Sequence, residues 1–181
     1  KLQWVKFSGA SWRHDSKGFF YSRYDQPRDN KLEGANYFQK LYYHAIGTPQ
    51  SDDPLIYERP DKKDWLISGN VTDDGRFLII TISQGTDRKN RVYYKDLQSK
   101  NGQVVKLLDE FDAAYSFIDN EGSILWFRTD LNASRGRVIA IDVSKPERKN
   151  WKELISETTE TLDGVSSVGG VLIASYLKDA H

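Results

Sequence analysis

The residues nearest to a serine-nucleophile motif lie late in the chain, in Gly164-Val-Ser-Ser-Val-Gly-Gly. A serine hydrolase of the α/β type places its nucleophile in Gly-x-Ser-x-Gly, on a sharp turn between a strand and a helix. Here Val168 stands where the second glycine belongs, and the Val-Leu-Ile-Ala-Ser that follows is typical of a strand. The spacing therefore favours a plain hairpin over a nucleophile elbow.

Histidines and paired carboxylates could bind a metal or move protons, but their spacing here favours neither role. His14, His44 and His181 show no His-x-x-x-His or similar spacing that would bring two ligands together. His14 falls in a predicted turn and His44 in a predicted strand, so we expect structural roles for both. Asp73 and Asp74 open an Asp-Asp-Gly turn, in which Asp73 can bond its own backbone. The sequence predicts no catalytic residue, no metal site and no cofactor.

A charged run, Thr86-Asp-Arg-Lys-Asn-Arg, joins two predicted strands. Its simpler interpretation is a solvated hairpin tip. The functional alternative is a contact at a rim, either with a peptide or with a neighbouring domain.

The elements that must position these residues recur with a period near 50. Each copy is a strand, a Gly-containing turn and a second, more apolar strand, and the turn glycines Gly18, Gly75, Gly122 and Gly170 are 57, 47 and 48 residues apart. Such a period, built from short strands, is typical of a β-propeller with one blade per repeat. The fold class is therefore predicted to be all-β, with about three and a half four-stranded antiparallel blades.

The strand pattern divides the chain into blades at about 7–60, 65–110, 114–156 and a half-blade at 162–177. The first strand of the first blade is expected over Phe7 to Arg13. This blade is longer than the others because of a polar insertion, roughly Gln26 to Asn36, which predicts a long hairpin loop. The chain ends inside its fourth unit and begins without Met, so we expect it to be a segment of a larger protein.

Composition limits the classes of partner. Lys plus Arg and Asp plus Glu both number 26, so the formal net charge is zero and no basic field would attract nucleic acid. Cysteine is absent, which excludes disulfides, a thiol nucleophile and thiolate metal sites. No apolar run approaches the roughly 20 residues of a membrane helix. We expect a cytoplasmic location, with the periplasm as the alternative.

Longer word matches indicate a family. Val5-Lys-Phe-Ser-Gly-Ala-Ser-Trp-Arg-His-Asp-Ser-Lys-Gly-Phe-Phe-Tyr-Ser-Arg-Tyr, Gly85-Thr-Asp-Arg-Lys-Asn-Arg-Val-Tyr-Tyr-Lys-Asp-Leu and Tyr176-Leu-Lys-Asp-Ala resemble the propeller of prolyl oligopeptidases. The resemblance implies a seven-bladed propeller capping an α/β-hydrolase domain, whose Ser-Asp-His triad cleaves short peptides after proline. The chain matches about half of that propeller and none of the hydrolase domain. It implies a peptidase for the parent protein and predicts that this segment alone is inactive.

The same resemblance implies substrate-binding and gating residues. Phe7 matches an aromatic that lines the pocket for substrate residues upstream of proline, Leu66 stands where some members have methionine, and Thr86 where some have cysteine. Thr86 departs in polarity, and packing within a blade is the alternative role for Phe7 and Leu66. The insertion matches a mobile loop that gates access between domains, here carrying Arg28, Asn30, Glu33 and Asn36.

The resemblance also implies the partners. They are proline-containing peptides, the hydrolase domain and the remaining blades of the parent protein, with no nucleic acid and no membrane. The alternative is a non-catalytic propeller module that binds proteins. A sugar-binding propeller ranks below both, because Asp73-Asp-Gly lacks the downstream Trp of such repeats. An isolated segment should expose blade faces and strand edges, and we expect it to self-associate through them.

Overall fold

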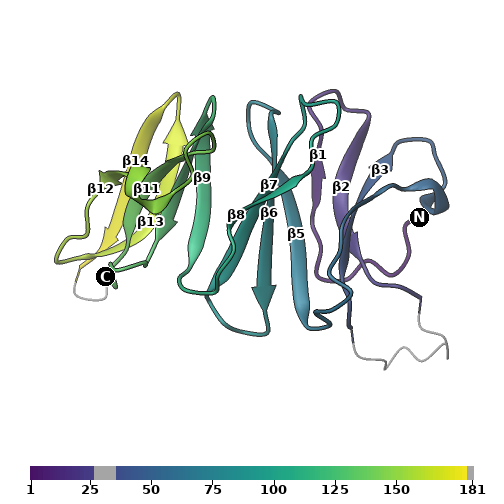
Figure 1. Ribbon diagram of the computed structural model, residues 1–181, viewed down its shortest axis with the longest axis horizontal. Coiled ribbons are helices and arrows are strands. Elements are labelled where there is room, and N and C mark those ends of the chain that lie inside the picture. The colour runs from purple at the N-terminus through teal and green to yellow at the C-terminus, as the bar shows by residue number, and fades with distance from the viewer. Residues whose placement is uncertain (27–35, 179–181) are drawn as a thin grey trace. The chain divides into compact units, whose positions relative to one another are not determined.

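The computed structural model describes residues 1–26 and 36–178. Within these ranges the chain forms three four-stranded antiparallel sheets and one two-stranded sheet, each a simple meander of consecutive strands (Figure 1). The strands are β1 (Ala10–Trp12), β2 (Gly18–Arg23), β3 (Lys40–Ala45) and β4 (Leu55–Tyr57); β5 (Trp65–Val71), β6 (Phe77–Gln84), β7 (Asn90–Asp96) and β8 (Val104–Leu108); β9 (Tyr115–Glu121), β10 (Ile124–Thr129), β11 (Arg137–Asp142) and β12 (Lys152–Ile155); and β13 (Thr161–Val168) and β14 (Val171–Leu177). This is the predicted all-β architecture of three and a half blades.

The chain divides into two compact units. Unit 1 comprises Lys1–Asp87 and Val92–Lys106, and unit 2 comprises Arg88–Arg91 and Leu107–His181. Two single 3-10 turns complete the described structure, η1 (Gln50–Asp52) and η2 (Arg148–Asn150), each between the third and fourth strands of a sheet. Within the described residues no helix has the length and apolarity that a membrane span requires.

The second strand of each four-stranded sheet is largely buried, because it has a neighbouring strand on both sides and apolar residues on both faces. In unit 1, β6 buries Phe77 through Ile80 without alternation. In unit 2, β10 likewise buries Leu125 through Phe127. Continuous apolar runs of this kind are expected where a sheet is covered on both faces. Gly69 on β5 shows how close the packing is, since an added Cβ would lie 3.1 Å from Leu41 and Leu78 side-chain atoms.

The repeated glycines prove not to be equivalent. Gly75, Gly122 and Gly170 have φ of 72°, 57° and 80°, the left-handed conformation that hairpin turns require of glycine. Gly18 instead begins β2, and the positive φ of the first turn falls on Ser16 at 56°. Gly18 is needed for space, because an added Cβ would lie 2.2 Å from the His44 carbonyl oxygen.

Two sequence predictions need correction at the residue level. In the β5–β6 turn it is Asp74, not Asp73, whose carboxylate accepts hydrogen bonds, from Thr72 Oγ1 at 2.6 Å and from Arg76 N at 3.0 Å. The first strand begins at Ala10, not at Phe7, because Phe7 adopts φ of 52° and cannot extend it. Phe7 therefore belongs to a separate N-terminal segment, residues 1–9.

Candidate functional site

Two of the three substrate-binding residues expected from the sequence, Leu66 and Thr86, lie where β5 begins and β6 ends. Antiparallel pairing sets Trp65 opposite Gln84 and Leu66 opposite Ser83. Thr86 follows two residues after Gln84, in the turn to β7. Leu66 is half-buried and Thr86 is exposed. The register therefore brings Leu66 and Thr86 to the same end of the second sheet, where β5 begins and β6 ends. We call this place the β5 edge.

A buried glutamine connects Phe7 to this edge. Gln39 is 2% exposed, and its Nε2 donates to the carbonyls of Lys6 at 3.1 Å and Phe7 at 3.3 Å. Its Oε1 accepts from the backbone N–H of Ile67 at 2.7 Å. Ile67 follows Leu66 directly, so one side chain ties the backbone of Phe7 to the start of β5. The three expected residues therefore belong to one region of unit 1.

Two serines hold the N-terminal segment from its other side. Ser8 Oγ accepts from the backbone N–H of Ser22 at 2.7 Å, and Ser22 Oγ in turn donates to the Ile67 carbonyl. The backbone N–H of Tyr24 donates to the Trp4 carbonyl at 3.1 Å. Phe7 is thus fixed by hydrogen bonds on both sides while 72% of its surface stays exposed.

Sequence reasoning missed Gln39, Ser8 and Ser22. Their types carry no functional signal, because glutamine and serine are common on protein surfaces. Only the fold shows that Gln39 and Ser22 are buried and that each is hydrogen-bonded to the same residue of β5.

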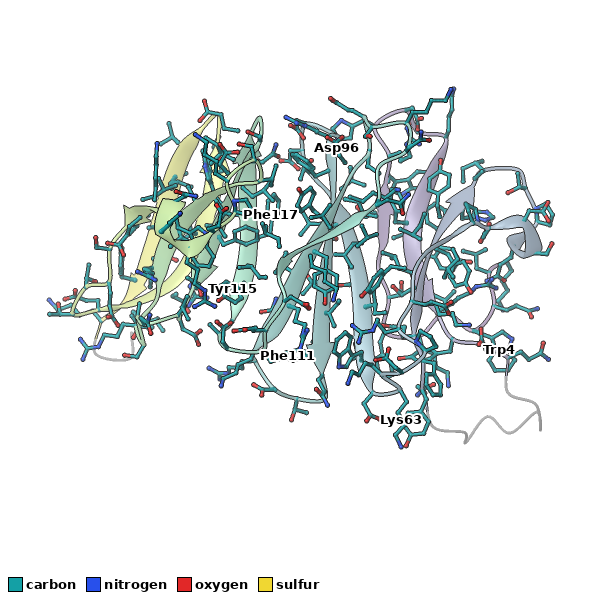
Figure 2. The ribbon with its side chains drawn as sticks, viewed as in Figure 1. Trp4, Lys63, Asp96, Phe111, Tyr115 and Phe117 are labelled. Atoms are coloured by element: carbon teal, nitrogen blue, oxygen red, sulfur yellow. The ribbon has the colours of Figure 1, made fainter. Side chains whose placement is uncertain are left out.

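Two more exposed aromatic residues immediately precede Gln39 in the chain. Tyr37 and Phe38 are 44% and 40% exposed. The backbone N–H of Phe38 donates to the Lys63 carbonyl at 2.8 Å, and Lys63 Nζ lies 4.9 Å from the Tyr37 ring centroid. Figure 2 labels Trp4 of the N-terminal segment and Lys63 of the turn before β5. An exposed group of aromatic side chains on fixed backbone can bind apolar parts of a ligand.

A hollow of about 240 Å³ lies beside these aromatics, lined by Asp25, Phe38, Gln39, Lys40, Glu58, Arg59 and Pro60. Lys40 Nζ is 2.7 Å from Asp25 and 3.6 Å from Glu58. Burial lowers the pKa of Lys40, but the hydrogen bond to Asp25 and the nearby charges of Asp25 and Glu58 together outweigh it and raise that pKa overall. Arg59 stacks on Trp65 at 4.6 Å. The hollow therefore offers fixed charge and an apolar wall, which suits binding.

Part of the expected gating loop lies outside the described residues. Arg28, Asn30 and Glu33 fall in residues 27–35, and their gating role stays a prediction. Asn36 is exposed and precedes Tyr37.

The serines and histidines that the sequence analysis considered for catalysis or metal binding have structural roles here. Ser166 and Ser167 lie within β13, paired with β14, so no strand-to-helix elbow forms there. His14 is exposed, and His44 Nδ1 lies 2.8 Å from Asp53 Oδ1, an aspartate that also accepts from Tyr21. No group of three potential metal ligands occurs in the part of the chain that the structure describes.

Comparison with known proteins identifies the family to which this chain is similar. Residues 1–181 match the family model described as the N-terminal β-propeller domain of prolyl oligopeptidase. The prolyl endopeptidase of Elizabethkingia miricola is 38% identical over 177 residues, which cover 97% of this chain and 24% of that protein. Prolyl oligopeptidase A of Galerina marginata is 37% identical over 188 residues, covering 98% of this chain and 25% of the relative.

Solved structures agree with these relatives. A structure from a study of inter-domain dynamics in two prolyl endopeptidases superposes with a TM-score of 0.88 at 32% identity, covering 99% of this chain and 25% of that one. Prolyl oligopeptidase B from Galerina marginata, bound to a 35mer hydrolysis and macrocyclization substrate, gives a TM-score of 0.85 at 29% identity, covering 96% and 25%. The chain thus spans about a quarter of the length of the proteins it matches.

Proposed function

This chain belongs to the prolyl oligopeptidase family, as part of its N-terminal β-propeller domain, and we propose that it serves a proline-specific serine endopeptidase as a substrate-gating element. In this role Phe7 and the β5 edge, which carries Leu66 and Thr86, together form part of an apolar subsite for residues upstream of proline. The loop carrying Arg28, Asn30, Glu33 and Asn36 controls access to it. The full-length protein would be cytoplasmic.

The observation that carries this proposal is the fixed, exposed side chain of Phe7. An aromatic ring in water forgoes roughly 1.5–3 kcal/mol that its burial would provide. A positive φ at a bulky residue adds backbone strain of about 1–2 kcal/mol. Gln39 and Ser8 nevertheless hold the segment in this conformation. Such an arrangement is expected where the ring is completed by a ligand or a neighbouring domain.

The chemistry of the full-length enzyme would be acyl transfer, in which a serine attacks the carbonyl carbon of proline, an acyl-enzyme forms and the amine of the following residue leaves. The reacting groups would come from the hydrolase domain, so this segment alone is expected to be inactive. Its own contribution is binding and orientation, and the charged hollow beside Phe38 would hold polar parts of the peptide. Prolyl oligopeptidase B from Galerina marginata was solved bound to a 35mer substrate. For a peptide of that length, an extended binding surface on the propeller would be useful.

The test is Phe7→Ala in the full-length protein, with Ile46→Ala as the control. Ile46 is 56% exposed and follows β3 at the opposite end of the first sheet. Phe7→Ala should lower kcat/KM by about tenfold to a hundredfold for a peptide with two residues upstream of proline, as expected from losing 1.5–3 kcal/mol of burial. It should have little effect on a substrate that begins at proline.

Three results would count against the proposal. Equal losses for both substrates, or an equal loss in Ile46→Ala, would remove Phe7 from the subsite. No cleavage of any proline peptide by the unmodified full-length protein would favour the non-catalytic interaction module instead.

A further inference from the structure

Unit 2 contains a second hollow, of about 180 Å³, that the function proposed above does not use. It lies where β9 begins and β10 ends, and it is lined by residues of the β10–β11 turn and the first residue of β13. This is the end of the β9–β12 sheet that corresponds, strand for strand, to the β5 edge of the second sheet. Its lining differs in kind, because charged and hydroxyl side chains replace aromatic ones.

The lining is strongly basic. Arg88, Arg128 and Arg135 reach it from three separate segments, and Asp130 is the carboxylate among its lining residues. Asp130 Oδ1 is already engaged, accepting from the backbone N–H of Ala114 at 2.8 Å. The lining residues therefore carry two more positive than negative charges. Glu157, whose Oε1 accepts from Ser134 Oγ at 3.4 Å and from Arg135 N at 2.6 Å, lies beside them and reduces the local excess to one, in a chain whose formal net charge is zero. A local excess of this kind attracts an anion.

Arg128 adds a direct indication of a missing acceptor. Its Nη2 donates to the Leu162 carbonyl, but its buried Nε–H has no hydrogen-bond partner among the described residues. Buried N–H groups are rarely left without an acceptor, and each such group in a native structure calls for an explanation. Ser116 stands directly opposite Arg128 in the β9–β10 register and also lines the hollow.

Gly136 keeps the space around this guanidinium open. A Cβ built at Gly136 would lie 3.2 Å from Leu162 Cβ and 3.6 Å from Arg128 Nε. Gly136 also has φ of 86°, so larger residues are disfavoured on two grounds. The three arginines, the orphaned N–H and the open position converge on one volume.

We propose that this hollow binds a carboxylate group of a peptide, through the arginine guanidinium edges and the Ser116 hydroxyl. The planar fork of arginine matches a carboxylate with two parallel hydrogen bonds. A phosphate dianion fits less well, because Asp130 would repel its second charge. That the carboxylate comes from a peptide rests on the proposed function, whereas the charge argument does not. The group is either an acidic side chain or a peptide C-terminus.

The test measures binding to the full-length protein after a serine-directed inhibitor has blocked cleavage. Three labelled peptides are compared by fluorescence anisotropy: Ala-Pro-Ala-Glu-Ala and Ala-Pro-Ala-Gln-Ala with amidated ends, and the second with a free C-terminus. We expect at least one of the two carboxylate peptides to bind tenfold or more tightly than the amidated glutamine peptide. Which one it is identifies the source of the carboxylate. Equal binding of all three would overturn the proposal.

Variants locate the effect. Arg88→Gln combined with Arg135→Gln should abolish the preference for the carboxylate peptide, whereas Lys149→Gln, an exposed charge change on η2 of the same unit, should leave it intact. Arg128 is not changed, because its bond to Leu162 supports β13. Ser116→Glu would place a carboxylate opposite Arg128 and should also abolish the preference while raising the melting temperature. An equal loss in Lys149→Gln would mean general electrostatic attraction and would overturn the site.

A competition experiment distinguishes a carboxylate from a phosphate ligand. The activity assay distinguishes failure of the anion site from failure of the proposed function. Acetate should displace the bound peptide at a lower concentration than inorganic phosphate does, and the reverse order would overturn the carboxylate assignment. If the proline-peptide assay fails while the arginine variants still remove the carboxylate preference, the proposed function is wrong and the anion site stands. If cleavage depends on Phe7 but the arginine variants change nothing, the anion site is wrong.

Discussion

The β1–β4 sheet of unit 1 and the β9–β12 sheet of unit 2 share a strand order and anchor themselves with the same pair of residue types. In each, a buried tyrosine donates its hydroxyl to an aspartate, Tyr21 to Asp53 at 2.6 Å and Tyr115 to Asp112 at 2.9 Å. In each, the aspartate also meets a cation or a potential one. The similarity ends with the identity of that second partner.

In unit 1 the second partner is His44, with 12% of its side chain exposed, and the Asp53 side chain is fully buried. In unit 2 it is Arg148 of η2, with 53% of its side chain exposed. Burial would raise the pKa of Asp112, but the hydrogen bonds from Arg148 and Tyr115, the positive charge of Arg148 and a backbone hydrogen bond together outweigh it and hold that pKa below its ordinary value. The aspartate of unit 1 is thus held by a buried hydrogen-bond network, whereas the aspartate of unit 2 is held by an ion pair at the surface. The difference teaches that one architecture can be held by forces that respond differently to salt and pH.

The largest expected difference between the sheets is in their first hairpins. Gly18→Ala should destabilise unit 1 by about 3 kcal/mol, because the new Cβ would lie 2.2 Å from a backbone carbonyl and 2.4 Å from the Tyr43 hydroxyl. Gly122→Ala has nothing within 4 Å of the new Cβ and meets only the cost of its φ of 57°. That cost is about 1–2 kcal/mol. Hydrogen exchange over β2 and β10 in the full-length protein measures each effect locally.

Equal losses in the two variants would mean that the backbone around His44 relaxes easily. The contrast between a packing glycine and a turn glycine would then disappear.

These glycines also show where sequence reading succeeds. The repeat predicted the three and a half antiparallel blades correctly, because a period near 50 and apolar second strands are set by the fold itself. Gly18 was read as a turn residue because it stands two residues from the true turn, and only coordinates show Tyr43 and His44 against it. Phe7 was read into a strand because its type suits one. Its segment is held in place by hydrogen bonds from Gln39 to the Phe7 carbonyl and from Ser22 to Ser8, which no local pattern reveals.

The basic hollow was harder still to predict. Arg88 belongs to the charged run Thr86–Arg91, for which a rim contact was one of two interpretations. Arg128 and Arg135 follow 40 and 47 residues later. Strand pairing and the β10–β11 turn bring them together, and sequence spacing alone does not.

The second comparison concerns the aspartate networks. Asp53→Asn should cost about 2 kcal/mol, because the amide keeps the acceptor for Tyr21 but brings an N–H₂ group into a buried network fitted to two carboxylate oxygens. Arg148→Gln should cost less than about 1 kcal/mol, as is usual for an exposed ion pair. Hydrogen exchange over η1 and η2, at low and high salt, measures both.

Salt sharpens this comparison further. The effect of Arg148→Gln should shrink as salt is added, and that of Asp53→Asn should not. An Asp53→Asn effect that falls with salt would show that water reaches the network in unit 1.

The smallest expected effect concerns the titration of the two buried tyrosines, Tyr21 and Tyr115. Burial, reinforced by the hydrogen bond to Asp53, raises the pKa of Tyr21 from about 10 to about 12, while the bond from Gln50 lowers it slightly. Because the folded pKa lies above the unfolded one, the stabilisation is complete below about pH 10 and is lost as the pH rises through about 12. Burial and the bond to Asp112 also raise the pKa of Tyr115, so Tyr21→Phe is compared with Tyr115→Phe. The ultraviolet absorbance of tyrosinate should lose one late-titrating group in each variant.

Asp53→Asn separates the two causes in unit 1. Without the carboxylate, the pKa of Tyr21 should fall toward its ordinary value, but not reach it, because burial remains the larger cause. Asp112→Asn tests the same point for Tyr115 in unit 2. If Asp53→Asn leaves the titration of Tyr21 unchanged, burial alone sets that pKa. The tyrosine–aspartate pair of unit 1 would then be a packing contact rather than the electrostatic counterpart of the pair in unit 2.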